Sequence, residues 1–99
     1  MTQLIKMIAY QKGAVVSRTV VKKDTGTVTL FSFAKGQGLS EHTAPFDALV
    51  YLVEGEAEIT IAGKLQRAVK GDLVTLPANR PHALKAVKKF KMMLIMIKK

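Results

Sequence analysis

Apolar and polar residues alternate along most of this chain with a repeat of two. The alternation is clearest over 56–62, EAEITIA, where Ala57, Ile59 and Ile61 are separated by polar residues. A repeat of two is typical of β-strands with one buried face and one hydrated face. Interrupted by glycine, proline and aspartate turn residues, the pattern predicts strands over 14–21, 27–34, 47–54, 56–62, 65–69, 73–77, 82–87 and 90–97.

The strand pattern determines the expected fold class. No segment shows the 3.6-residue repeat of a helix. Short strands joined by glycine-rich turns predict an all-β antiparallel sandwich or barrel without substantial helix. The 99 residues are enough for one domain, 1–99. Residues 1–12 leave two alternatives open, a first strand or an N-terminal arm.

Composition adds an expectation about assembly. Hydrophobic residues make up 48% of a 99-residue chain. A domain this small buries a modest share of its surface, and large exposed apolar patches are rare on monomers. We therefore expect part of the apolar surface to lie in a homodimer interface. The chain has no cysteine, which excludes a disulfide framework and a thiolate metal site.

The formal net charge is +9, and six of the seven acidic residues lie between Glu41 and Asp72. Such asymmetry can indicate nucleic-acid binding. Lysine, however, outnumbers arginine, the better phosphate ligand, and no helix-turn-helix segment is present. We expect the lysines to serve solubility and do not expect a nucleic-acid partner. No apolar run approaches the roughly 18 residues of a membrane span and no targeting signal is visible, so we expect no membrane partner and a cytoplasmic location.

The segment 71–87, GDLVTLPANRPHALKAV, breaks a strand pattern with two prolines and resumes it at His82. Proline cannot donate to a strand ladder, so the chain is expected to bend here. The other histidine is His42. An isolated histidine is more often structural than functional, but imidazole is also the commonest protein metal ligand.

The spacing around these histidines resembles the two conserved motifs of the cupin superfamily. The segment 36–55, GQGLSEHTAPFDALVYLVEG, resembles the first motif, and 71–86 resembles the second. The resemblance covers nearly the whole chain and implies a jelly-roll-like cupin β-barrel. In that fold Pro77 begins a tight turn and His82 points into the barrel. Asn79 replaces a turn glycine, and asparagine tolerates the left-handed conformation this requires.

The resemblance also implies a divalent transition metal as cofactor, and here the sequence departs from the family. Cupin ligands are two histidines and a glutamate from the first motif and a histidine from the second. His42 and His82 match, but Ala44 and Ala48 occupy the other ligand positions, and Ala86 replaces a motif asparagine. Metal sites need three or four protein ligands. Asp47, one residue out of register, supplies a third only if a bulge turns it inward.

The alternative role for the two histidines is to bind a small molecule at the wall of an apolar chamber. We expect the walls to be the alternating residues Leu30, Val50, Leu52, Ile59, Ile61, Leu84, Met92, Leu94 and Met96. Met92 and Leu94 are candidate ligand contacts, and Arg80 is a candidate anion contact at the barrel mouth.

The sequence thus supports a main functional hypothesis and an alternative. The first is a small-molecule-binding cupin domain, non-catalytic or weakly catalytic, with a reduced metal site. The alternative is a metal-dependent enzyme of the oxygenase or isomerase type, using His42, His82 and a third ligand. The resemblance further implies a homodimer in which the 1–12 segment crosses to the partner.

Overall fold

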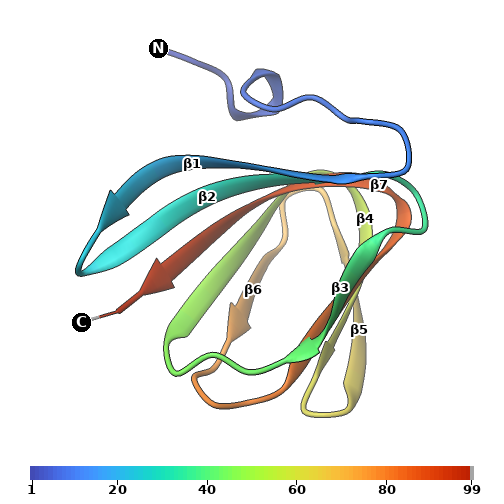
Figure 1. Cartoon of the computed structure of the whole chain (residues 1–99). Coiled ribbons are helices and arrows are strands. Elements are labelled where there is room, and N and C mark those ends of the chain that lie inside the picture. Colours follow the sequence, from blue (N-terminus) through green and yellow to red (C-terminus); the bar gives the residue numbers. More distant parts are fainter. Residues whose placement is uncertain (99) are drawn as a thin grey trace.

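The computed structural model describes residues 1–98 and leaves Lys99 outside (Figure 1). A short 3₁₀-helix precedes a series of antiparallel strands, and no other helix is found in these residues. The elements are η1 Leu4–Lys6, β1 Val15–Lys23, β2 Gly26–Phe33, β3 Gly38–His42, β4 Asp47–Ile61, β5 Lys64–Val69, β6 Leu73–Leu76 and β7 His82–Ile97. The all-β prediction is confirmed. Residues 1–12 form no strand, which favours the arm over the first-strand alternative.

Two long strands, β4 and β7, run through both layers of the molecule. Their halves nearest Asp47 and Ile97 lie in the layer β1-β2-β7-β4-β6. Their other halves lie in the layer β3-β7-β4-β5. The result is a jelly-roll-like, barrel-shaped fold in which the sheet bends over itself rather than closing fully.

The bend in β4 and β7 corrects the predicted strand boundaries. We expected separate strands on each side of Gly55 and on each side of 88–89, but each pair is one continuous bent strand. At the bend Gly55 has φ +87°, and a Cβ there would meet the backbone of Lys89 and Phe90. Register shifts flank Gly55 in the β4–β7 pairing. Glycine therefore allows the two backbones to approach where the sheet folds, and the sequence signal was misread as a turn.

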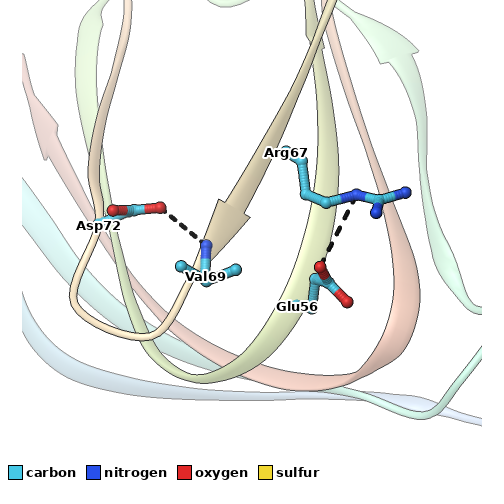
Figure 2. Close-up of polar contacts among 4 residues, drawn as sticks. All are labelled: Glu56, Arg67, Val69 and Asp72. Carbon is cyan, nitrogen blue, oxygen red and sulfur yellow. Dashed lines mark hydrogen bonds and ion pairs between the residues drawn. The ribbon is translucent and has the colours of Figure 1, made fainter.

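The β4–β5 hairpin turns at Ala62 and Gly63, both with positive φ, as the glycine predicted. Beyond β5, the Val69 N–H donates to Asp72 Oδ2 at 2.8 Å, which closes the turn into β6 (Figure 2). Arg67 Nε lies 3.8 Å from Glu56 Oε1 across the hairpin. This ion pair is partly exposed, so its contribution is small.

The core lies between the two layers. It contains Phe33, Val50, Leu52, Ile59, Leu84, Phe90 and Met92, all almost fully buried. The rings of Phe33 and Phe90 stack at 4.3 Å between centroids. The prediction that Leu30 forms a wall of the apolar chamber is wrong. The residue is fully buried but is not part of this core, because on β2 the alternation directs Phe31 and Phe33 inward and Leu30 to the other face.

The N-terminal arm, residues 1–12, covers part of that outer face. Ile8 is buried, and Ser32 Oγ donates to the Ala9 carbonyl at 2.8 Å. Lys91 is 8% exposed and its Nζ donates to the Ile5 carbonyl at 2.6 Å. Tyr10 donates to Glu54 Oε2 at 2.6 Å. The arm is thus bound to its own chain in this structure, which leaves the predicted crossing to a partner untested.

Candidate functional site

A cavity of about 110 Å³ lies between the layers, near the end of the molecule where β3 ends and β7 begins. Its only titratable lining residues are two histidines, and the rest of the lining is apolar. The lining residues are Leu39, His42, Ala44, Ala48, Val50, Leu76, His82, Leu84, Met92, Leu94 and Met96. Five of the nine predicted wall residues line the cavity, and two of these five, Met92 and Leu94, are the predicted ligand contacts.

Backbone pairing brings the two histidines together. His42 ends β3 and His82 begins β7, and the two residues are register partners. Their Nε2 atoms lie 3.1 Å apart, and the rings meet at 72° with centroids 4.4 Å apart. The bend after β6 aims His82 inward: Asn79 adopts φ +63°, as its left-handed tolerance predicted, and its N–H donates to the Ala44 carbonyl at 2.8 Å.

Backbone carbonyl oxygens contact the Nδ1 atoms of both rings and so fix the orientation of the rings. His42 Nδ1 lies 2.7 Å from the Ser40 oxygen, and His82 Nδ1 lies 3.2 Å from the Arg80 oxygen. A carbonyl oxygen can only accept, so each of these contacts needs a proton on Nδ1. The contact between the two Nε2 atoms needs one further proton, on one of these two nitrogens. Two neutral imidazoles carry one N–H each, so a singly protonated pair satisfies all of the contacts and a neutral pair does not.

Burial decides which ring stays neutral. His82 is 7% exposed, and burial lowers its pKa, with the charge of His42 acting in the same direction and the Arg80 carbonyl opposing both. His42 is exposed at the cavity rim. The lowered pKa favours the neutral form of His82 within the pair.

The alanines that replace cupin ligands lie where the motif spacing placed them. Ala44 and Ala48 line the cavity beside the histidines. Ala86 lies in the core. Methyl groups thus stand where the family's polar groups would converge, and the cavity gains apolar surface.

The structure does not bring Asp47 or Arg80 into the cavity. Asp47 Oδ1 accepts a hydrogen bond from the Ala78 N–H at 2.9 Å, and no bulge turns its side chain inward. Arg80 is exposed and contributes only its backbone oxygen, to His82. Sequence reasoning missed Leu39 and Leu76. Leu76 lies within the predicted strand 73–77, whereas Leu39 lies in β3, a segment whose weak alternation predicted no strand.

The donor set does not fit the divalent metal that the family implies. Within residues 1–98 no three His, Cys, Asp or Glu side chains come together. The two imidazoles offer two nitrogens, whereas catalytic zinc sites use three protein ligands and oxygenase sites add a carboxylate. The other cavity walls are hydrocarbon and thioether.

Comparisons with known proteins show the family to which this chain belongs. A family model described as "Cupin domain" matches residues 29–98. A conserved protein of unknown function from Streptococcus pyogenes is 36% identical, with TM-score 0.95 over 100% of this chain and 87% of that one. A cupin 2 conserved barrel domain protein from Leptotrichia buccalis is 41% identical, with TM-score 0.92 over 95% of this chain and 46% of that one.

A cupin superfamily protein from Desulfitobacterium hafniense is 31% identical, with TM-score 0.93 over 97% of this chain and 88% of that one. No curated protein matches the chain. In the part of the chain that the structure describes, no helix is long and apolar enough to cross a membrane. The chain belongs to the cupin superfamily.

Proposed function

We propose that this cupin domain binds a small molecule in the cavity between its layers. The His42–His82 pair would hold a polar group of the ligand, and the apolar walls would hold the remainder. One observation carries the proposal: the paired Nε2 atoms are the polar feature of a cavity that is otherwise apolar. An apolar pocket with a few aimed polar groups is the usual form of a ligand site.

The cavity volume limits the ligand. At about 110 Å³ the cavity is smaller than the roughly 150 Å³ of an engineered cavity that accepts benzene. Drug-sized ligands need about 300 Å³ or more. We propose that the buried part of the ligand is a short aliphatic group, and that any larger part extends past the exposed ring of His42.

The histidine pair suggests the polar group. A carbonyl or carboxylate oxygen that enters between the rings can accept an Nε2–H, because both Nδ1 positions are already occupied by the Ser40 and Arg80 carbonyls. A carboxylate oxygen is the stronger of these two acceptors, because a charged partner strengthens a hydrogen bond. Since no acid or base other than these two histidines lines the cavity, we propose a non-catalytic or weakly catalytic role.

The alternative, a metal-dependent enzyme of the oxygenase or isomerase type, has one observation in its favour. Both Nδ1 atoms lie against carbonyl oxygens, as is common behind metal-bound histidines. It lacks a third ligand among the described residues. The binding role therefore remains our first proposal.

The test is a ligand-observed NMR titration of the intact chain with acetate, propionate, butyrate and hexanoate. Each methylene that enters the cavity should strengthen binding by about 0.8 kcal/mol, roughly fourfold, until the cavity is full. The matching primary alcohols should bind more weakly because they lack the carboxylate. Ala48→Leu should block binding while leaving both histidines in place.

The matched control is Ala83→Leu, which adds the same side chain at an outward position next to His82. It should leave the dissociation constants unchanged. Binding that survives Ala48→Leu, or that does not depend on chain length, would place the ligand outside the cavity and overturn the proposal.

A further inference from the structure

Two methionines line the same cavity as the histidine pair. Met92 and Met96 lie four positions apart on β7, and both belong to the cavity lining. Alternation along a strand directs every second residue to one face, so the intervening Met93 lies on the opposite, outer face, where its register partners are Leu30 and Tyr51. The cavity lining therefore contains two thioether sulfurs besides its two imidazoles, and Met93 is a third methionine of the same strand that lies outside it.

The bend of β7 places these donors on opposite sides of the cavity (Figure 1). His82 begins β7 in the layer β3-β7-β4-β5, whereas Met92 and Met96 lie in its second half, in the layer β1-β2-β7-β4-β6. The cavity between the layers has a volume of about 110 Å³. Methionine has three rotatable bonds and adapts to irregular space, so its sulfur can move within a cavity of this size. Ala48, the register partner of Met96, leaves room for such a movement because it carries only a methyl group.

The contact between the two histidines requires a cation. Each Nδ1–H donates to a carbonyl oxygen, of Ser40 or Arg80, so a neutral ring has its only proton on that side. The two Nε2 atoms of a neutral pair then face each other at 3.1 Å, each with a lone pair. A proton or a metal ion between these nitrogens removes the repulsion. Two nitrogens of a tetrahedral site, with bonds of about 2.0 Å, lie about 3.3 Å apart, which is close to the observed spacing.

The chemistry of the cavity lining selects the ion. Thioether sulfur is a soft ligand that favours Cu(I), whereas Mg²⁺, Ca²⁺ and Mn²⁺ favour carboxylate and carbonyl oxygens. None of the described residues that line the cavity is an acid. The cost of burying an ion rises with the square of its charge, so neutral walls disfavour a divalent ion more strongly than a monovalent one. Two imidazoles and two thioethers are thus a neutral, partly soft donor set that suits Cu(I).

We propose that the cavity binds one Cu(I) ion through the Nε2 atoms of the histidine pair and the sulfurs of Met92 and Met96. The backbone carbonyls behind both rings hold each Nε2 toward the ion, as carbonyls commonly do behind metal-bound histidines. The proposal concerns binding alone and involves no change of oxidation state. The ion occupies the gap where the proposed small molecule would place its polar group, so the two compete for the site, but neither proposal depends on the other.

The test is an anaerobic titration of the full chain with Cu(I), in competition with the chromogenic chelator bathocuproine disulfonate. The wild type should bind one Cu(I) ion per chain. Met92→Leu and Met96→Leu should each weaken binding at least about tenfold, because each removes one soft ligand. Met93→Leu is the matched control and should leave the affinity unchanged, since it removes the same sulfur from the outer face. Exchange of methionine for leucine nearly conserves volume, so the fold should tolerate all three changes.

Two further measurements identify the ligands and the ion. Copper-edge X-ray absorption should show nitrogen and sulfur bonded to the ion in the wild type, and nitrogen without sulfur in the Met92→Leu/Met96→Leu double variant. Zn²⁺ in about tenfold excess should not displace Cu(I), because the site lacks the third nitrogen, oxygen or thiolate ligand that zinc needs. Circular dichroism should confirm that every variant is folded.

Several outcomes would overturn the proposed copper site. They are a wild type that does not bind Cu(I), an affinity unchanged by both Met92→Leu and Met96→Leu, an equal loss in Met93→Leu, no sulfur in the absorption spectrum, and displacement of Cu(I) by Zn²⁺. The titration contains no carboxylate ligand, so its failure would leave the proposed small-molecule site standing. Failure of the carboxylate titration would likewise leave the copper site standing.

Discussion

His42 and His82 lie 40 positions apart in the sequence and meet at 3.1 Å between their Nε2 atoms. Each ring is fixed from behind by the carbonyl of the residue two positions earlier, Ser40 or Arg80. The pair is thus held in place by contacts with its own backbone. Its position in an apolar wall follows from the alanines that occupy the neighbouring ligand positions of the family.

Restoring those positions should create a metal site. We expect Ala44→His combined with Ala48→Glu to bind Zn²⁺ at least 100-fold more tightly than the wild type, since it raises the ligand set from two to four. Elemental analysis of chelator-free protein and calorimetric titration would measure this. Near-stoichiometric metal in the wild type, lost in both His42→Ala and His82→Ala, would favour the enzyme alternative instead.

The control for this double variant is Ala83→His, which places an imidazole beside His82 on the outward side of β7. We expect it to add no tight site, because its ring cannot reach the cavity. If Ala83→His bound zinc as well as the double variant, the inward placement of Ala44 and Ala48 would not be the cause.

Stability should decrease with acidification through His82. Burial lowers the pKa of this ring below its ordinary 6.5, so the unfolded state binds a proton at a pH where the folded state does not. The contribution is fully present above pH 6.5 and is lost as the pH falls through the lowered folded-state pKa. Urea unfolding between pH 7.5 and pH 5 should show a larger loss for wild type than for His82→Leu. Equal pH dependence in the two proteins would contradict the expected protonation state.

Much of the fold and part of the site could be predicted from spacing. Alternation identifies most strands because one face of each is buried, and the interval from Gly71 to His82 locates the turn that aims the imidazole. Leu30 was misassigned because β2 has apolar residues on both faces. The N-terminal arm docks on the face of β2 that carries Leu30 and leaves the face with Phe33 toward the core. This docking is a long-range contact that the alternation of β2 alone does not show.

The predictions for Gly55 and Asp47 also depended on contacts with residues distant in the sequence. Gly55 looks the same in sequence whether it makes a turn or allows two bent strands to touch, and the difference lies in a contact with Phe90, 35 positions away. Asp47 was an ambiguous candidate because its orientation depends on a bulge. The regular pairing Asp47–Ile97 and the hydrogen bond to Ala78 resolve that ambiguity.

The bend itself can be tested at Gly55. We expect Gly55→Ala to destabilise the fold by about 3 kcal/mol, because it combines a positive φ with a clash against the Lys89 carbonyl. Gly63→Ala is a control with a similar φ, +80°, but open space around the position, so it should cost about 1 kcal/mol. Chemical unfolding would measure both. Equal costs would mean that close approach at the bend is not what requires glycine.

The attachment of the N-terminal arm depends on a buried lysine. Lys91 donates to the Ile5 carbonyl and lies over the Tyr10 ring, with Nζ 4.9 Å from its centroid. Lys91→Met keeps most of the apolar stem but leaves that carbonyl without its donor, which should cost about 2 kcal/mol. The amides of Lys6 and Met7, which donate to the first residues of the arm, should exchange faster with deuterium.

Lys89 provides a matched comparison, because its Nζ lies 4.7 Å from the same ring while its side chain is exposed. Lys89→Met removes only a hydrated cation–π contact, so it should cost less than about 1 kcal/mol and leave exchange in the arm nearly unchanged. If both variants loosened the arm equally, the aromatic contact and not the buried hydrogen bond would hold it. If neither did, the buried apolar contact of Ile8 would be sufficient to keep the arm on the sheet.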